Sequence, residues 1–242
     1  MNAQKRTYRS SEKGGQRTFR LGACVRLWRP RSRVEGDVVR VLNLHCACGE
    51  ITWSIEEALP RLGIRYVCHC DDCQAFAHFT GRADRLLDAN GGTDAYQLPA
   101  SRVRIIKGLE ALACVQMTSR PLLRWHCATC RTPVANTYGT SAVSFVSLPL
   151  AAASGGDRES ILGPSSGHVW TKFGVGDLSQ ARQVNIPAML WRMACRIFVA
   201  RVSGDYRNNP FFDHKDGRPI VEPRRLSPSE RHDLDRRAAA SG

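Results

Sequence analysis

The sequence predicts a mainly β protein with a helical C-terminal part, which makes an α+β fold overall. Short runs rich in β-branched and aromatic residues, separated by turns, recur before residue 150. Several of these runs end directly in a group of cysteines, which marks the turns between strands. Beyond residue 167 the apolar residues recur every three or four positions, which is the spacing of an amphipathic helix.

The predicted strands lie in the first half of the chain. Residues 38–44 are β-rich and residues 51–55 alternate apolar and polar side chains, so we expect two strands joined through a cysteine turn. The segments 102–107 and 112–117 predict a further pair of strands, joined to each other across a glycine turn. Residues 80–97 contain several acids and glycines and predict loop. Further strands are expected at 65–67, 122–125 and 142–150, and a short helix or irregular arm at 74–79.

The C-terminal part contains the predicted helices. Pro187 suits a first helical position and Gly204 a helix end, so these two residues bound a predicted helix. Residues 227–230 read Ser-Pro-Ser-Glu, which is a capping box that opens a last helix. Between the two helices, Phe211 and Phe212 are expected to pack back onto the body of the protein. The apolar face of the first helix is predicted to comprise Met189, Leu190, Met193, Ile197 and Phe198.

The positive charge is concentrated at the N-terminus. The formal net charge is +13, and residues 1–40 carry eleven Lys or Arg against three acids. We expect residues 1–36 to be a disordered basic tail, with nucleic-acid binding through residues 5–40 as the alternative. No apolar run approaches the roughly 20 residues of a membrane helix, and the tail lacks the hydrophobic core of a secretory signal. These features predict a cytoplasmic protein with no membrane partner.

Ten cysteines in a chain without a secretory signal favour metal binding in a reducing compartment over a disulfide framework. Thiolate sulfur suits zinc, and a structural zinc site has four ligands. Two distant turns together supply four cysteines, which we call the first cluster and expect to close around one structural zinc ion. The first cluster is Cys46, Cys48, Cys127 and Cys130.

The second cluster, Cys68, Cys70 and Cys73, then has three thiols of its own. A catalytic zinc site has three protein ligands and an open fourth position, which among thiolates suits a thiol substrate. The alternatives are a second structural site, completed by a histidine, by Asp71, by Asp72 or by another unit, and a loop with no metal. His69 is expected to point away from the ion, because neighbouring side chains alternate in direction.

The order of the cysteine motifs resembles that of one known family. Residues 46–49 read C-x-C-G, residues 68–74 read C-H-C-x-x-C-Q, and residues 127–133 read C-x-x-C-x-T-P. Over residues 46–137 this is similar to the glutathione-dependent formaldehyde-activating enzymes and centromere protein V. The resemblance implies a β-tent of small antiparallel sheets around zinc, with a structural ion at the first cluster and the ion associated with activity at the second.

The implied activity is that of a carbon–sulfur lyase, which reversibly joins the thiol of glutathione to formaldehyde. The chain departs from the family at Arg131, where relatives carry glycine and where a left-handed backbone would cost roughly 1 kcal/mol or more. We therefore predict a two-zinc, carbon–sulfur lyase-like enzyme acting on a small thiol adduct, with Cys68, Cys70 and Cys73 as the catalytic residues. The alternative is a non-catalytic zinc-stabilised binding module. Three parts are expected: the tail at 1–36, a zinc-binding β domain at 37–150, and a connector with a helical extension at 151–242.

Overall fold

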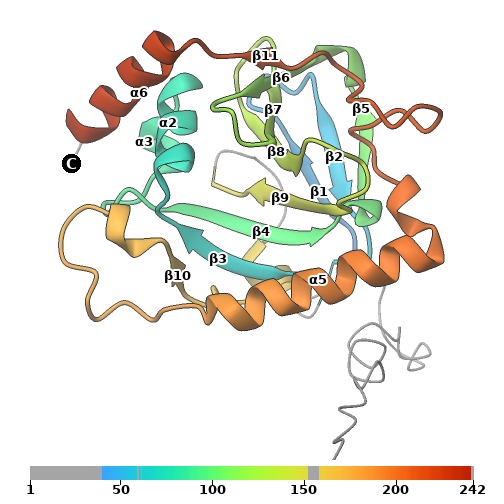
Figure 1. The fold of residues 1–242 in the computed structure, drawn as a ribbon, viewed down its shortest axis with the longest axis horizontal. Coiled ribbons are helices and arrows are strands. Elements are labelled where there is room, and N and C mark those ends of the chain that lie inside the picture. The colour runs from blue at the N-terminus through green and yellow to red at the C-terminus, as the bar shows by residue number, and fades with distance from the viewer. Residues whose placement is uncertain (1–39, 59, 61, 152–157, 241–242) are drawn as a thin grey trace, which may run out of the picture.

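The computed structural model describes residues 40–58, 60, 62–151 and 158–240 (Figure 1). The predicted basic tail at 1–36 lies outside these residues. The fold is mainly β, with two sheets and a few helices, and α+β overall, which confirms the predicted class. In the described part of the chain, no helix combines the length and the apolar character needed to cross a bilayer.

The strands form two sheets of unequal size. The small sheet has the order β1-β2-β5 and is antiparallel. The large sheet has the order β10-β3-β4-β9-β8-β7-β6-β11, and only its edge strands β10 and β11 run parallel to their neighbours. The strands are β1 Leu42–His45, β2 Thr52–Ile55, β3 Ile64–Cys68, β4 Thr93–Pro99, β5 Val103–Lys107, β6 Leu112–Gln116, β7 Leu122–Cys127, β8 Pro133–Tyr138, β9 Phe145–Pro149, β10 His168–Val169 and β11 Arg224–Arg225.

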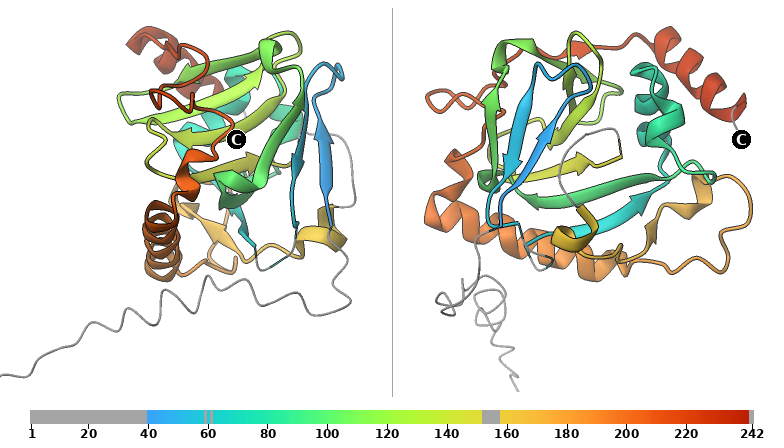
Figure 2. Two further views of the ribbon diagram at one scale, coloured as in Figure 1. Left: turned by 90° about the vertical axis from the view of Figure 1, so that its right-hand side faces the viewer. Right: turned by 180° about the vertical axis from the view of Figure 1, so that it is seen from behind.

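The main core lies between the two sheets, which face each other in Figure 2. Trp53 on β2 and Trp125 on β7 are both fully buried in it. Phe211 and Phe212 pack on Trp125, with ring centroids 5.1 and 6.4 Å away, as the sequence predicts. Burying a large aromatic side chain stabilises a fold by about 1.5–3 kcal/mol, so this cluster ties the C-terminal segment firmly to the sheets.

The strand predictions succeed where a strand has a strong local pattern. Strands β1 and β2 form the predicted antiparallel pair around the first cysteine turn, with Leu44 opposite Trp53. The prediction that 102–107 and 112–117 pair with each other is wrong. β5 pairs with β2 and β6 pairs with β7, because the chain leaves one sheet for the other at Gly108. Gly108 has φ 79°, and a Cβ there would lie 2.1 Å from the carbonyl oxygen of Glu50.

The loop predicted for 80–97 is wrong over its last residues. Strand β4, Thr93–Pro99, lies inside the large sheet between β3 and β9. Its sequence TDAYQLP contains residues that are rare in strands, yet Ala95, Tyr96 and Leu98 are buried. Packing on both neighbours therefore outweighs the weak intrinsic preference of this segment. A helix, α3 at Ala83–Leu86, occupies another part of the predicted loop.

Helix α5, Ile186–Ser203, begins and ends where the sequence predicts. Asn185 caps it by accepting a hydrogen bond from the Ala188 N–H at 2.9 Å, and Gly204 ends it with φ 78°. The predicted apolar face is only partly correct. Met193 contacts Gln97 of β4, whereas Leu190 and Phe198 are 49% and 52% exposed. The helix lies along one edge of the large sheet (Figure 1). The sheet therefore covers a narrower stripe of apolar side chains on α5 than the composition of the helix suggests.

The remaining helices are α2 Asp71–Phe79, α4 Arg158–Leu162 and α6 Pro228–Ala240. α6 opens with the predicted capping box. The Glu230 N–H donates to the Ser227 hydroxyl at 3.2 Å, and the Ser227 N–H donates to the Glu230 carboxylate at 2.8 Å. Leu234 of α6 packs with Phe76 of α2, so the last helix lies alongside α2 (Figure 1).

The turn between β7 and β8 has the left-handed backbone expected at the family's glycine position. Arg131 has φ 57° and an exposed side chain. A non-glycine residue in this region strains its Cβ against the following carbonyl oxygen. The turn is thus strained locally at the point where it presents its two cysteines.

Replacing this residue with glycine is expected to stabilise the protein. Relief of the strain, less the greater freedom of glycine in the unfolded chain, leaves a net gain of about 0.5–1 kcal/mol for Arg131→Gly. A domain of this size gains about 2–4 °C in Tm per kcal/mol, which thermal unfolding can measure. Arg131→Ala is the control, since it removes the same side chain but keeps the Cβ and should bring no gain. An equal gain in both variants would contradict a backbone origin.

Candidate metal centres

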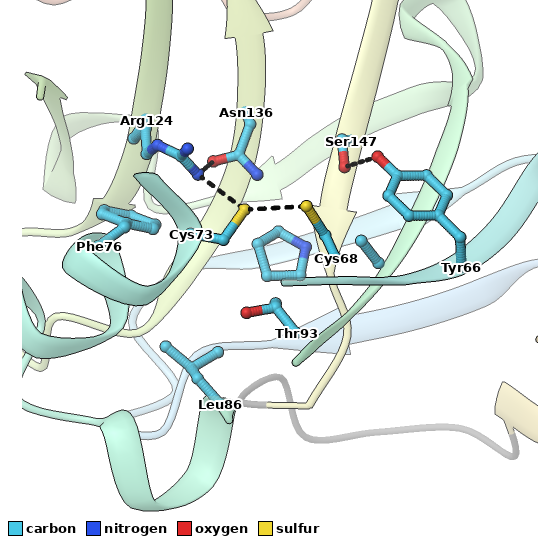
Figure 3. Close-up of a pocket in the computed structure, with 11 residues that line it drawn as sticks. Tyr66, Cys68, Cys73, Phe76, Leu86, Thr93, Arg124, Asn136 and Ser147 are labelled. Atoms are coloured by element: carbon cyan, nitrogen blue, oxygen red, sulfur yellow. Dashed lines mark hydrogen bonds between the residues drawn. The ribbon is translucent and has the colours of Figure 1, made fainter. Parts of the chain in front are cut away.

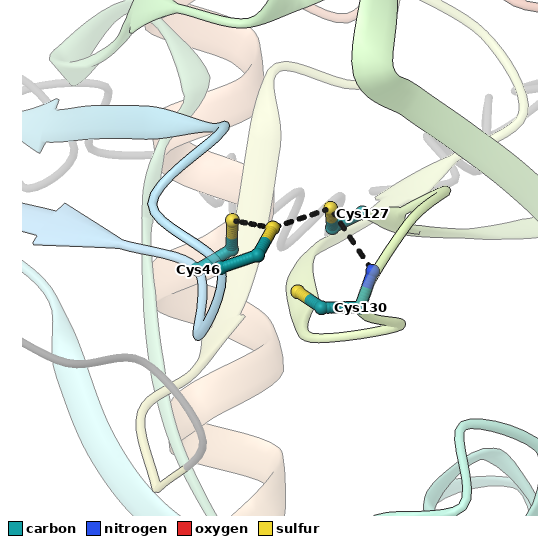
Figure 4. A group of neighbouring side chains, drawn as sticks. Cys46, Cys127 and Cys130 are labelled. Atoms are coloured by element: carbon teal, nitrogen blue, oxygen red, sulfur yellow. Dashed lines mark hydrogen bonds between the residues drawn. The ribbon is translucent and has the colours of Figure 1, made fainter.

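The four thiols of the first cluster converge between the two sheets. Cys46 and Cys48 come from the turn between β1 and β2, Cys127 is the last residue of β7, and Cys130 lies in the turn that leads to β8 (Figure 4). All four sulfurs lie within 4.8 Å of one another, with 3.3 Å between Cys46 and Cys48 and 3.7 Å between Cys48 and Cys127. Sulfurs at about 2.3 Å from a tetrahedral zinc ion lie roughly 3.8 Å apart. The spacing fits such an ion.

Backbone and hydroxyl groups around the first cluster favour thiolate. The N–H groups of Ile51 and Cys130 donate to the sulfurs of Cys46 and Cys127 at 3.2 and 3.5 Å. Burial raises the pKa of the Cys130 thiol, but hydrogen bonds from Thr132 and neighbouring groups outweigh burial and hold the pKa at about 6. Donors directed at sulfur stabilise its charged form, which is the form that binds metal.

The second cluster lies at the junction of a strand and a helix. β3 ends at Cys68, Cys70 is the N-cap of α2, and Cys73 lies in the first turn of that helix. The three sulfurs lie within 4.8 Å of one another, with 3.5 Å from Cys68 to Cys70 and 3.7 Å from Cys68 to Cys73. The structure thus brings together the predicted groups of four and three. Both groups could bind metal ions, and the roles of the individual cysteines as ligands stay a prediction.

His69 is turned away from the second cluster, as expected from alternation. Its side chain is fully buried, and both ring nitrogens have partners on the far side. Nδ1 lies 3.0 Å from the carbonyl oxygen of Asn90, and Nε2 lies 2.9 Å from Nδ1 of His168. The ring is buried because β10 brings His168 against it. This imidazole is not available to the three sulfurs.

The two acids that could complete the second cluster are also held elsewhere. Asp72 is 5% exposed and is bound on both oxygens by arginines, at 2.9 Å by Arg231 and at 3.3 Å by Arg120. Asp71 accepts the Asp72 N–H at 2.9 Å and lies 3.7 Å from Arg231. Among the described residues, no carboxylate or imidazole joins the three sulfurs as a fourth donor.

A buried arginine borders the second cluster. Arg124 on β7 is 2% exposed; its Nη1 lies 3.7 Å from the Cys73 sulfur and 3.2 Å from Asn136 Oδ1. A buried cation is costly without a compensating charge, and no carboxylate of the described chain forms an ion pair with it. Burial would lower the pKa of Arg124, but the charges of Cys73 and Cys70 outweigh burial and raise it.

Cys73 is the thiol of the second cluster that ionises most readily. The sulfurs of Cys68 and Cys70 lower the pKa of Cys73 well below the usual value, and Arg124 lowers it further. Three thiolates around a divalent ion carry one net negative charge, which a single guanidinium balances. Charge and spacing both fit a zinc ion at this cluster.

A small recess with a cavity volume of about 20 Å³ lies beside these sulfurs. Cys68 and Cys73 form one side of it, with Phe76 and Leu86 as apolar neighbours (Figure 3). A row of polar side chains of the large sheet forms another side. Arg124, Asn136 and Ser147 come from the adjacent strands β7, β8 and β9, and Tyr66 comes from β3. Tyr66 and Ser147 are joined through their hydroxyls at 3.3 Å, and burial raises the pKa of Tyr66.

The sequence predictions did not include this polar row. Arg124 had a usable signal, because a charge inside the apolar run LLRWHC needs either solvent or a partner. Asn136, Ser147 and Tyr66 had no local signal. They come together only through the register of β3, β7, β8 and β9, which the sequence alone does not specify.

Fold and site together define a mainly β protein with two cysteine clusters that could bind metal ions. The chain belongs to DUF6151, a family of unknown function, which it matches over residues 38–223. Among solved structures, a protein from Rhodobacter sphaeroides is similar at 21% sequence identity, over 51% of this chain and 96% of that chain, with a TM-score of 0.36. No curated protein matches the sequence of this chain.

The zinc content of cysteine variants distinguishes the roles of the two clusters. We expect about two zinc ions per wild-type chain and about one in Cys70→Ser with the fold intact, because the first cluster keeps four sulfurs. Cys46→Ser should unfold, since structural zinc contributes roughly 10–16 kcal/mol against a total stability of about 5–15 kcal/mol. Elemental analysis and circular dichroism measure both results. Unfolding of the Cys70→Ser variant would instead indicate that the second cluster is a structural metal site.

The charge of Arg124 is expected to support metal binding at the second cluster. Groups that contact metal ligands typically change affinity by about 10–100-fold when removed, so Arg124→Met should weaken zinc binding there by this factor. Competition with a chromophoric chelator measures the affinity. Arg104→Met is the control, because it removes one positive charge from a side chain that is 65% exposed and lies on β5 of the small sheet. Equal affinity in both variants would show that Arg124 does not balance the thiolates.

Proposed function

We propose that this protein is a zinc-dependent, carbon–sulfur lyase-like enzyme that acts on the adduct of a small thiol, such as glutathione, with formaldehyde. The observation that carries the proposal is the second cluster, where three sulfurs lie within 4.8 Å of one another and no described histidine or acid supplies a fourth donor. Two of the three cysteines, Cys68 and Cys73, line the recess. The resemblance of the three cysteine motifs to the formaldehyde-activating family supports the same activity.

The reaction forms or breaks one carbon–sulfur bond. In the forward direction the thiol sulfur bonds to the carbonyl carbon, and the thiol proton ends on the carbonyl oxygen, so no oxidant or reductant is needed. Bound at Cys68, Cys70 and Cys73, zinc would hold a substrate thiol deprotonated at neutral pH. Arg124 offsets the charge of the sulfurs, and the apolar side chains of Phe76 and Leu86 limit the access of water to the recess.

Two acids that could have served as proton acceptors are poorly placed for this role. Asp72 is buried, and Arg231 and Arg120 occupy its oxygens. Asp71 is more exposed, yet one of its oxygens accepts a hydrogen bond from the Asp72 N–H. The proton is therefore best assigned to solvent at the mouth of the recess.

Adduct formation can be followed directly. Glutathione and formaldehyde also combine without a catalyst, so exchange NMR is used to compare the interconversion rate with and without protein. Wild-type protein is expected to accelerate exchange, and Cys70→Ser to lose at least about 100-fold of this acceleration, because the site then lacks one of three ligands. Cys114→Ala is the control, since Cys114 is a buried free thiol that belongs to neither cluster.

An exchange rate in wild-type protein equal to the uncatalysed rate would refute the proposal. It would favour the alternative from the sequence, a zinc-stabilised module that binds nucleic acid through residues 5–40. Removal of residues 1–39 separates the two functions. An enzyme that works at the second cluster keeps its turnover, whereas a module that binds through the tail loses its salt-sensitive affinity for nucleic acid.

A further inference from the structure

One buried hydroxyl in the recess has no partner. Thr93 is 5% exposed, and its Oγ1 makes no hydrogen bond although no solvent reaches it. Four other buried side-chain atoms in the described chain share this condition, in Trp53, His78, His126 and Asn209, but none of these residues lines the recess. Buried polar atoms are nearly always hydrogen-bonded, so an unpaired one that borders a cavity indicates a missing ligand atom.

Thr93 lies next to the second cluster. It is directly opposite Cys68 in the register of β4 and β3, so the two side chains lie on the same face of the sheet. Figure 3 shows Thr93 across the recess from Arg124 and Asn136. The Cβ atoms of such cross-strand pairs are about 4.5–5.5 Å apart. A ligand atom bound beside the Cys68 sulfur would therefore lie close to the Thr93 hydroxyl.

The other polar groups of the recess are already paired. Tyr66 and Ser147 bond to each other at 3.3 Å, and Asn136 Oδ1 accepts from Arg124 at 3.2 Å. The charge of Arg124 is directed at Cys73, so the recess offers little attraction for an additional anion. Thr93 carries the hydroxyl of the recess that has no hydrogen-bond partner, so it is free to bind a ligand oxygen.

We propose that Thr93 is a specificity-determining residue that binds an oxygen of the ligand held at the second cluster. The ligand class is a small thiol that carries a neutral hydroxyl or carbonyl oxygen close to its sulfur. This inference rests on the proposed function, because it needs a thiol at the open position of the three-cysteine site. It adds a selection rule that the cysteines alone do not supply.

Cobalt-substituted protein provides a readout that is independent of turnover. Thiolate bound to cobalt gives charge-transfer absorption, so binding of an added thiol can be titrated. The probes are 2-mercaptoethanol, which carries a hydroxyl, and ethanethiol, which does not. Thr93→Val removes the hydroxyl at similar volume, Thr93→Ala is a second hydroxyl-free variant, and Thr93→Ser keeps the hydroxyl. The spectrum of the Cys70→Ser variant gives the contribution of cobalt at the first cluster alone.

The expected result is a selective loss. Wild-type protein and Thr93→Ser bind 2-mercaptoethanol, and Thr93→Val and Thr93→Ala bind it about 3–10-fold more weakly, as one hydrogen bond would give. Ethanethiol binds all four proteins with equal affinity. Unchanged 2-mercaptoethanol affinity in both hydroxyl-free variants, or an equal loss for both thiols, would overturn the role of Thr93. A wild-type cobalt spectrum that responds to neither thiol would instead overturn the open site on which the proposed function stands.

Discussion

The contact between the two cysteine turns is the constraint on which the rest of the structure depends. It joins the small sheet, through the turn after β1, to the large sheet, through the turn after β7. The Ala47 N–H also donates to the Thr132 hydroxyl across this contact at 3.1 Å. Four thiolates this close would repel one another strongly, and a divalent cation bound among them would convert an unfavourable contact into a strong link between the sheets. The aromatic core around Trp125 then fills the space that the link defines.

The second cluster depends on a different balance. Burial disfavours the charge of Arg124, but the charges of Cys73 and Cys70 raise its pKa, and the pKa of Cys73 is lowered first by the sulfurs of Cys68 and Cys70 and further by Arg124. A lone charge in a buried site costs several kcal/mol, so the guanidinium and the thiolate each favour the charged form of the other. The guanidinium comes from the large sheet and the sulfurs from the β3–α2 junction. Their pairing therefore fixes the position of α2 relative to the sheet, and with it the width of the recess.

The features predicted correctly from the sequence are those with local chemistry. The cysteine turns, the ends of α5 and the capping box of α6 each depend on residues a few positions apart, whose preferences act without the rest of the fold. Strand β4 and the partners of β5 and β6 were not predictable in this way, because their pairing is decided by contacts between distant segments.

The same distinction between local sequence signals and long-range pairing applies to the candidate site. Its sulfurs could be predicted from the sequence because cysteine spacing carries the geometry of a metal turn. The side chains that surround them could not. Arg124 gave a hint as a charge in an apolar strand, while Thr93 lies in a segment that resembles loop. What makes Thr93 informative is its register opposite Cys68, which exists only once β3 and β4 are paired.

The C-terminal part of the chain takes a direct share in holding the second cluster, although it contains none of the seven clustered cysteines. His168 forms a hydrogen bond with His69, which lies between Cys68 and Cys70 in the sequence. The Phe173 carbonyl oxygen accepts a hydrogen bond from the side chain of Gln74 in α2. Arg231 of α6 binds Asp72, which lies between Cys70 and Cys73. α6 follows residue 223, where the match to the family ends. The geometry of the three-sulfur loop in this chain therefore depends in part on a helix outside the matched region, and a change in α6 would act on the site through α2.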